Sequence, residues 1–505
     1  MNFALLVDFG STWTKVRAVD LDEARVVGAA QGPSTVATDV TIGLEQALAR
    51  LHAELGHVPT YRVRLGSSSA AGGLKMVTAG LVRELTAEAA RQAALGAGAR
   101  LVGSYAYRLT RADVREIETL APDIVLLCGG TDGGNRDILL HNAEAIAKSA
   151  YAGPVIVAGN RDAADEVLER LPDALVCANV MPEFGVLAIE PARARIREVF
   201  MSRIVHAKGI DRARGLLDDV VLPTPAAVLE GAELLAAGPG GNDGLGPLVV
   251  VDPGGATTDV HSVGESAPET GVVRLGLPEP HAKRTVEGDL GMRHNAASIV
   301  ESAGAEAIAA DARLTVARLH ELLVPIAADV ERLPATAEEH ALDRALARAA
   351  IRLAVRRHAG TLETVHTAQG PVQVQRGKDL GRVATLIGTG GVIVHAPQPC
   401  ELLAAALADR ADPFSLGPVA ARLYVDSDYA LFASGLLARV DRRVAFALAR
   451  GALREAGEAG NADQVGGVDE TGSADDRVVA GPARAARDAA ATDGRIRAAV
   501  AARKS

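Results

Sequence analysis

Two stretches decide the fold that the sequence predicts: Leu6-Val-Asp-Phe-Gly-Ser-Thr-Trp-Thr-Lys15 and Val251-Asp-Pro-Gly-Gly-Ala-Thr-Thr-Asp259. In each, an apolar strand ends at an aspartate, a turn of small and hydroxyl residues follows, and a second strand leaves the turn. One such turn is typical of an ordinary hairpin. Because the same unit recurs in both halves of the chain, the pair indicates two similar lobes that face each other.

Both turns offer the groups that bind a phosphate. Glycine lets backbone N–H groups approach the anion, hydroxyl groups donate hydrogen bonds, and lysine adds positive charge. The predicted phosphate-binding residues are Gly10, Ser11, Thr12, Thr14 and Lys15 in the first turn, and Gly254, Gly255, Thr257, Thr258 and Asp259 in the second. Asp259 either closes its turn or orients a water molecule.

The aspartate that begins each turn cannot bind an anion directly. Asp8 and Asp252 are therefore predicted to be catalytic residues that act as outer ligands of Mg²⁺, which keeps waters and binds one or two carboxylates together with phosphates. Between them, the two turns are expected to hold a triphosphate.

A third glycine-rich turn follows an apolar strand late in the chain, at Leu386-Ile-Gly-Thr-Gly-Gly391. Its residues Gly388, Thr389, Gly390 and Gly391 are predicted to pack against adenosine, because only glycine lets the backbone lie flat against a base and ribose. The order phosphate, phosphate, adenosine is typical of the actin, sugar-kinase and heat-shock-chaperone class, and it predicts ATP as the nucleotide.

The residues between the two phosphate turns have a different character. Three short apolar strands, Asp123–Cys128, Pro154–Ala158 and Ala174–Ala178, are each followed by a polar or glycine-containing turn, and helical segments separate them. This alternation predicts a right-handed βαβ unit with a parallel sheet. Such sheets bind ligands at the carboxyl ends of their strands, although ordinary connecting loops are an equal alternative.

The expected fold class is therefore α/β: a two-lobed actin-like ATPase (ribonuclease H-like) fold with an inserted βαβ parallel-sheet domain and a disordered C-terminal tail. The tail is expected to be disordered because it contains few large apolar residues. The predicted parts are a first lobe (1–110), the inserted domain (111–236), a linker (237–247), a second lobe (248–450) and the tail (451–505).

The composition argues against several classes of partner. A net charge of −10 over 505 residues disfavours nucleic acid, because binding to a phosphate backbone relies on lysine and arginine. No stretch approaches the roughly 18 apolar residues of a membrane helix, and the N-terminus has no signal-peptide pattern. The three cysteines have neither metal-binding nor disulfide spacing. A cytoplasmic protein is expected.

Beyond the turns, the sequence resembles the glutamate mutase accessory protein family (MutL/GlmL) of the actin-like ATPase superfamily. The phosphate turns alone indicate the superfamily, and two further stretches, 67–86 and 287–293, make the resemblance specific. The full set of matching stretches is 6–15, 67–76, 81–86, 128–134, 251–259, 287–293 and 428–437. One departure is Pro253, where isoleucine is more usual; proline lacks an N–H donor and stiffens the turn.

The resemblance implies an ATP-binding, chaperone-like accessory or reactivating protein that hydrolyses ATP slowly. Its partner would be an adenosylcobalamin-dependent mutase. Hydrolysis would open and close the lobes and thereby act on this partner. Glu287 and Asp289 are further catalytic candidates for positioning water or Mg²⁺, because the heat-shock chaperones carry an acidic, glycine-containing turn at the corresponding place. An acidic helix cap before Gly291 is the alternative.

Other functions stay open on the sequence alone. A small-molecule kinase of the same fold would need a catalytic aspartate in the first lobe, for which Asp39 and Asp113 are available. A dehydratase activator would hold an iron–sulfur cluster, which the cysteine spacing disfavours, and a non-enzymatic scaffold or filament is a third alternative. A cobalamin-binding pattern at Asp259-Val-His261-Ser-Val-Gly264 is interpreted as a chance match.

Overall fold

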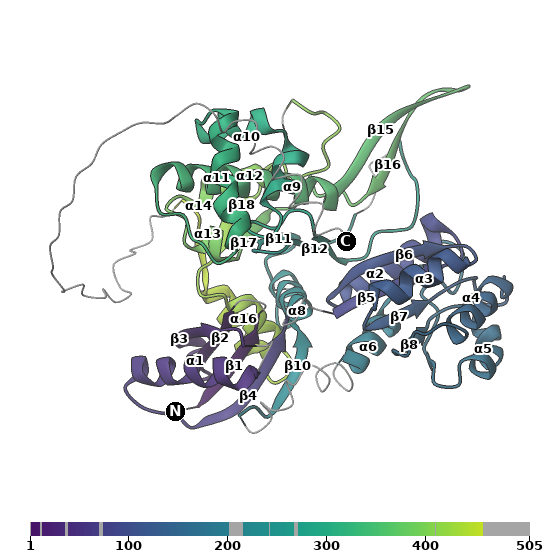
Figure 1. The fold of residues 1–505 in the computed structure, drawn as a ribbon, viewed down its shortest axis with the longest axis horizontal. Coiled ribbons are helices and arrows are strands. Elements are labelled where there is room, and N and C mark those ends of the chain that lie inside the picture. Colours follow the sequence, from purple (N-terminus) through teal and green to yellow (C-terminus); the bar gives the residue numbers. More distant parts are fainter. Residues whose placement is uncertain are drawn as a thin grey trace, which may run out of the picture. The chain divides into compact units, whose positions relative to one another are not determined.

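The first phosphate turn lies in a five-stranded sheet with the strand order β10-β4-β1-β2-β3 (Figure 1). Strands β1, β2 and β3 are antiparallel, whereas β4 and β10 run parallel to β1. Their bounds are β1 Phe3–Phe9, β2 Trp13–Asp20, β3 Arg25–Pro33, β4 Tyr61–Ser68 and β10 Asp219–Pro223. Helix α1 (Val40–Leu55) covers β2 and β3.

This structure is a computed structural model that describes residues 2–10, 13–35, 39–69, 74–200, 216–241, 243–266, 271–409 and 411–457. All of these residues fall within one compact unit, Met1–Ala459. None of the helices in these ranges is long and apolar enough to cross a membrane.

The second phosphate turn lies in a sheet with the order β14-β12-β11-β17-β18-β19. Here too the first three strands in sequence, β11, β12 and β14, are antiparallel, and the next two run parallel to β11. The bounds are β11 Leu248–Pro253, β12 Thr258–Val263, β14 Ala282–Glu287, β17 Thr385–Gly388, β18 Arg422–Asp426 and β19 Leu453–Glu455. The repeated strand order confirms the predicted fold class, two ribonuclease H-like lobes of an actin-like ATPase.

Alternating side chains of the central strands explain how the lobes share a core. On β11, Val249 and Val251 face the helices of the second lobe, whereas Leu248 and Val250 face a core that also contains Ala4 and Leu6 of β1. Successive strand residues point to opposite faces, so each sheet has one face toward this shared core. The shared core is filled by α8 Thr224–Ala237, α15 Ala430–Leu437 and α16 Arg442–Gly451.

The other face of the second sheet is covered by helices between β14 and β18, among them the long α12 (Ala337–Ala359). The remaining helices of this group are α9 Ala296–Ala303, α10 Ala305–Ala312, α11 Val316–Ala328, α13 Gly391–Val394 and α14 Pro399–Leu403. A small three-stranded sheet, in the order β13-β16-β15, extends from this lobe (Figure 1). Its strands, which the sequence analysis did not anticipate, are β13 Val272–Arg274, β15 Gly360–Thr367 and β16 Gly370–Gly377.

The inserted parallel sheet has the order β6-β5-β7-β8-β9. Its strands are β5 Leu74–Gly80, β6 Ala99–Ala106, β7 Ile124–Leu127, β8 Val155–Val157 and β9 Leu175–Val176. Its helices are α2 Glu88–Gly96, α3 Arg111–Leu120, α4 Asp137–Ala147, α5 Ala164–Arg170 and α6 Glu190–Val199. The sheet takes in β5 and β6 from the range expected for the first lobe, whereas β10 pairs with the first lobe. We therefore propose that the inserted domain spans about 74–200.

The structure describes parts of two segments that the sequence predicted to lack regular structure, the linker 237–247 and the tail 451–505. Within 237–247, the N–H groups of Leu245 and Gly246 donate to Leu235 and Ala236 of α8, which ties this connection back to the helix. In the range 451–505, residues 453–455 form β19, which pairs with β18. The predicted disorder of the tail otherwise concerns residues 458–505, which lie outside the described ranges.

Candidate nucleotide-binding site

The two phosphate turns are equivalent in geometry as well as in sequence. In the first hairpin Asp8 lies opposite Lys15, and in the second Asp252 lies opposite Asp259. Each turn is closed by its first glycine: the Gly10 N–H donates to Trp13 O at 3.0 Å, and the Gly254 N–H donates to Thr257 O at 2.8 Å. These two N–H groups therefore shape the turns.

Asp8 is held in place by two hydroxyl groups, one on β4 and one on the first residue of α8. Its Oδ1 atom accepts from Thr224 Oγ1 at 2.5 Å and from Ser67 Oγ at 3.3 Å. Burial raises the pKa of Asp8, while Lys15 and the two hydroxyl groups oppose the increase. Ser67 lies near the end of β4 and Thr224 directly follows β10, so the parallel strands bring both residues to the same edge of the sheet.

Asp252 belongs to the same charged cluster as Asp8. Burial raises the pKa of Asp252 to about 7, and the carboxylates of Asp259, Asp8 and Asp426 add to this effect, whereas Lys15 opposes it. The carboxylates of the two lobes therefore influence each other's protonation. Among the described residues no three acidic, histidine or cysteine side chains form a ready metal cage, and Mg²⁺ commonly keeps several waters.

The third glycine-rich turn lies directly against the second phosphate turn. The Thr389 N–H donates to Val251 O at 3.0 Å. A Cβ atom on Gly390, whose φ is +86°, would lie 2.5 Å from Asp252 Oδ1. By contrast, Gly388 packs against Leu403 in the core. The predicted contact with adenosine stays a prediction, but Gly390 is required where its backbone passes the Asp252 carboxylate.

Three residues of this cluster were not found by sequence reasoning. Asp426, at the end of β18, accepts from the N–H groups of Ala430 and Leu431 at the start of α15. The ring of Tyr429 lies against Lys15, with 4.3 Å between Nζ and the ring centroid. Arg17 donates to Asp428 O at 2.9 Å. A signal was available for one of them, because Asp426 ends an apolar strand as Asp8 and Asp252 do.

The hydroxyl residues of the turns differ in whether their side chains are exposed and able to donate to a phosphate. Thr258 is buried and donates to Leu290 O at 2.7 Å, so its side chain is engaged within the lobe. Thr14 is also buried. Thr257 donates to Asp259 Oδ2 at 3.1 Å and is partly exposed, and Gly255 is exposed. Ser11 and Thr12 lie outside the described residues.

Glu287 and Asp289 lie beside the second phosphate turn and share one cation. Arg357 Nη1 donates to Glu287 Oε2 at 2.9 Å and to Asp289 Oδ1 at 2.7 Å. Burial raises the pKa of Glu287, and Arg357 opposes this, whereas the hydrogen bond from Arg357 lowers the pKa of Asp289. Glu287 lies opposite Thr258 in the sheet, directly beside the end of the turn.

The cobalamin-like pattern falls on a buried strand. His261 is 1% exposed, and burial lowers its pKa to about 3, so the ring stays neutral. A histidine that ligates cobalamin must sit on an open loop, so its position on β12 disfavours that role.

The duplicated lobes and the paired aspartates define the class of protein: a two-lobed actin-like ATPase fold with one acidic phosphate turn in each lobe. The chain belongs to the MutL family. A family model described as MutL protein matches residues 4–453. Protein MutL from Clostridium tetanomorphum is 45% identical over 444 residues, which cover 87% of this chain and 96% of that protein.

Solved structures with a similar arrangement are distant. Nucleotide-free acetone carboxylase has a TM-score of 0.37 at 14% sequence identity, and the match covers 86% of this chain and 70% of the carboxylase chain. Xylulose kinase from Bifidobacterium adolescentis has a TM-score of 0.28 at 12% identity, covering 89% and 94%. Acetate kinase from Porphyromonas gingivalis has a TM-score of 0.28 at 12% identity, covering 87% and 100%. These likenesses are too low to say more about the site.

Proposed function

We propose that this chain binds ATP with Mg²⁺ between its two phosphate turns and serves as an ATP-driven accessory or reactivating protein for an adenosylcobalamin-dependent mutase. The observation that carries the ATP proposal is the charged cluster of Asp8, Asp252 and Lys15. Equivalent hairpins of the two lobes bring these residues together, and Gly390 lies against Asp252.

In this proposal each residue of the cluster has a distinct task. Asp8 and Asp252 orient waters around Mg²⁺, and Lys15 attracts the phosphates as a point charge. Bound Mg²⁺ would neutralise part of the phosphate charge. Glu287, partly buried beside the second turn, orients the attacking water, and Arg357 fixes the position of the Glu287 carboxylate.

The shared core between the lobes supports a motion driven by ATP. Helix α8 packs on α15, and α15 begins beside Tyr429 and Asp426, both members of the cluster. Arg17 of the first lobe donates to Asp428 O just before that helix. ATP that bridges the two turns would favour a closed arrangement, and hydrolysis would release it. Such opening and closing is a common way to act on a bound partner.

Membership of the MutL family favours an adenosylcobalamin-dependent mutase, such as glutamate mutase, as that partner. The net charge of −10 disfavours nucleic acid. We also propose a cytoplasmic location, with no membrane partner.

The test has two stages. ATP binding is measured by calorimetry with Mg²⁺ present, and hydrolysis by phosphate release, for the wild type, Asp8→Asn and Asp252→Asn. We expect hydrolysis to fall by about 100-fold or more in both variants, the scale that removal of one stabilising group reaches in other enzymes, while circular dichroism stays unchanged. Unaltered turnover in both variants would exclude the site.

The second stage uses a purified adenosylcobalamin-dependent glutamate mutase that has been inactivated by turnover. The wild-type chain with ATP is expected to restore activity when fresh adenosylcobalamin is added, and Asp8→Asn is not. If ATP binds and is hydrolysed but the mutase neither associates nor recovers, the partner proposal fails while the ATP proposal stands.

A small-molecule kinase is a weaker candidate, because both of its candidate aspartates cap helices. Asp39 accepts from the Thr41 N–H at the start of α1 at 2.9 Å. Asp113 belongs to a capping box with Thr110 at the start of α3, in the inserted sheet region. Neither carboxylate is free to deprotonate a substrate hydroxyl. ADP production that depends on an added small substrate would favour the kinase.

A further inference from the structure

Arg284 joins the second phosphate turn to the inserted domain through one buried guanidinium. The residue lies on β14 and is 4% exposed. Its Nε atom donates to Asp259 Oδ1 at 2.8 Å, and its Nη2 atom lies 2.5 Å from the same oxygen. From the other side of the fork, Nη1 donates to Leu95 O at 3.1 Å and to Ala99 O at 2.9 Å.

The two carbonyl groups belong to the connection between α2 and β6. Leu95 is in the last turn of α2, where backbone carbonyls carry partial negative charge, and its oxygen also accepts from the Gly98 N–H at 3.0 Å. Ala99 begins β6. Between them Gly98 has a φ of +92°, and a Cβ atom there would lie 2.8 Å from Pro223 Cβ. The connection is thus tightly packed, and Arg284 donates a hydrogen bond to each of these two carbonyl groups.

Asp259 also receives a hydrogen bond from Thr257, one of the predicted phosphate donors. Thr257 Oγ1 donates to Asp259 Oδ2 at 3.1 Å. A hydroxyl has one proton to donate. If Thr257 donates to a phosphate instead, Arg284 is the remaining hydrogen-bond donor to the Asp259 carboxylate among the described residues. The contacts therefore form a continuous path from the phosphate turn, through Asp259 and Arg284, to Leu95 and Ala99.

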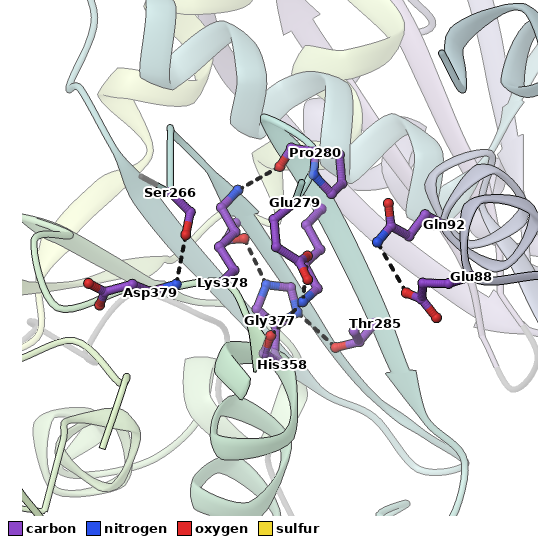
Figure 2. Close-up of polar contacts among 12 residues, drawn as sticks. Glu88, Gln92, Ser266, Glu279, Pro280, Thr285, His358, Gly377, Lys378 and Asp379 are labelled. Carbon is purple, nitrogen blue, oxygen red and sulfur yellow. Dashed lines mark hydrogen bonds and ion pairs between the residues drawn. The ribbon is translucent and has the colours of Figure 1, made fainter. Parts of the chain in front are cut away.

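The strand that carries Arg284 is fixed to the second lobe. At its start, Lys378 Nζ donates to Pro280 O at 2.9 Å and to His281 O at 2.7 Å. Further along, a ring nitrogen of His358 contacts Thr285 Oγ1 at 2.8 Å, and Lys283 Nζ donates to His358 O at 2.8 Å. Figure 2 shows Lys378, Pro280, Thr285 and His358 in this buried polar cluster, with Gln92 and Glu88 of α2 nearby. These contacts anchor β14, and with it the backbone of Arg284, within the second lobe.

We propose that Arg284 couples ATP binding at the second phosphate turn to the position of the α2–β6 connection, and so to the inserted domain. This coupling rests on the proposed ATP site. Arg284 is a positioning residue because it acts through Asp259: its planar guanidinium contacts the Asp259 carboxylate on one side and two carbonyl groups on the other. If the buried guanidinium moved away from either set of partners, some of its N–H groups would lose their hydrogen bonds at a cost in free energy. The positions of the two sets of partners are therefore linked.

The test is hydrogen–deuterium exchange of residues 93–101 in the full chain, with and without ATP and Mg²⁺, combined with calorimetric ATP binding. We expect ATP to change exchange in this segment of the wild type. In Arg284→Lys, which keeps the charge but not the two-sided fork, and in Arg284→Gln, the ATP-induced change should be lost. ATP affinity should fall by less than tenfold in both, because Arg284 does not contact the nucleotide.

Arg193 offers a matched control. It is also buried, lies on α6 of the inserted domain, packs against Gly96 of the same connection and donates to Ala282 O of β14 at 2.9 Å, but among the described residues no hydrogen bond joins it to Asp259 or Thr257. Arg193→Gln should therefore retain the ATP-induced change at 93–101. If both Arg284 variants keep the wild-type response to ATP, the coupling is refuted.

Two further outcomes separate this inference from the function on which it depends. A wild type that binds ATP without any change at 93–101 would overturn the coupling alone. A wild type that does not bind ATP would overturn the proposed function, and the coupling with it. Arg284→Lys keeps the test valid if Arg284→Gln does not fold.

Discussion

The Lys15 ammonium lies 4.3 Å from the centroid of the Tyr429 ring. Lys15 lies on β2, directly after the first phosphate turn. Tyr429 directly precedes α15, whose residues line the core shared by both lobes. Tyr429 has a φ of +51°, a conformation that non-glycine residues rarely adopt and that often marks functional positions. Burial raises the pKa of Tyr429, so the phenol stays neutral and its ring face attracts the ammonium.

The first prediction separates the aromatic ring from the hydroxyl at this position. Tyr429→Phe keeps the ring over Lys15 and should leave ATP affinity within about twofold. Tyr429→Leu removes the cation–π interaction, worth about 0.5–2 kcal/mol, and should weaken ATP binding by about 2- to 30-fold. Calorimetric titration with Mg²⁺–ATP measures both. Equal affinity in the two variants would mean that the ring does not position Lys15 for the nucleotide.

The cluster shows which residues of the candidate site the sequence could predict and which it could not. The hairpins around Asp8 and Asp252 are local, because one strand, one turn and the next strand determine them. Thr224 and Tyr429 reach Asp8 and Lys15 only through the packing of distant segments, which no local pattern encodes. Membership of β5 in the inserted sheet was missed for a related reason: a short apolar strand does not specify which neighbour it will pair with.

The second prediction concerns pH and the metal-free protein. Burial and nearby carboxylates raise the pKa of Asp252 to about 7 in the folded state, above its ordinary value of 3.8. Between these two values the folded chain holds more protons than the unfolded chain. This residue therefore makes stability fall as pH rises from about 4 to 7. Asp252→Asn should flatten that part of the dependence of Tm on pH and raise Tm at pH 7.5.

Asp289 provides a control of opposite sign. The Arg357 hydrogen bond lowers the pKa of Asp289, so its contribution to stability is present at neutral pH and is lost as the carboxyl protonates in acid. Asp289→Asn should therefore lower Tm at pH 7.5 relative to the wild type, or leave it unchanged because the pair is partly exposed. A rise in Tm for Asp289→Asn equal to that for Asp252→Asn would contradict the electrostatic interpretation.

The third prediction compares two adjacent glycines. Gly390→Ala would place a Cβ atom 2.5 Å from Asp252 Oδ1 at a φ of +86°, whereas a Cβ atom on Gly391 meets nothing closer than Tyr429 Oη at 3.6 Å. Gly390→Ala should destabilise the fold by about 1–3 kcal/mol and weaken Mg²⁺–ATP binding by displacing Asp252. Gly391→Ala should leave the stability unchanged, and a loss of ATP affinity in this variant would support the predicted contact of Gly391 with adenosine. Urea unfolding and calorimetry measure the two effects.

The fourth prediction distinguishes catalysis from simple ion pairing at Glu287. Its carboxylate is held by Arg357 at 2.9 Å and lies opposite Thr258, beside the second phosphate turn. If Glu287 orients the attacking water, Glu287→Gln should lower kcat for ATP hydrolysis by about 100-fold with unchanged ATP affinity. Asp289→Asn should have a smaller effect, because Asp289 is more exposed and lies beyond the end of β14.

Arg357→Gln is the matched variant for this prediction. It breaks the same ion pair but retains the Glu287 carboxylate, which is then less firmly positioned, so it should lower kcat much less than Glu287→Gln does. If the two variants instead lose stability equally and both hydrolyse ATP at the wild-type rate, Glu287 serves only to bind Arg357. Single-turnover phosphate release at saturating ATP decides between the two roles, because it isolates the chemical step from nucleotide binding.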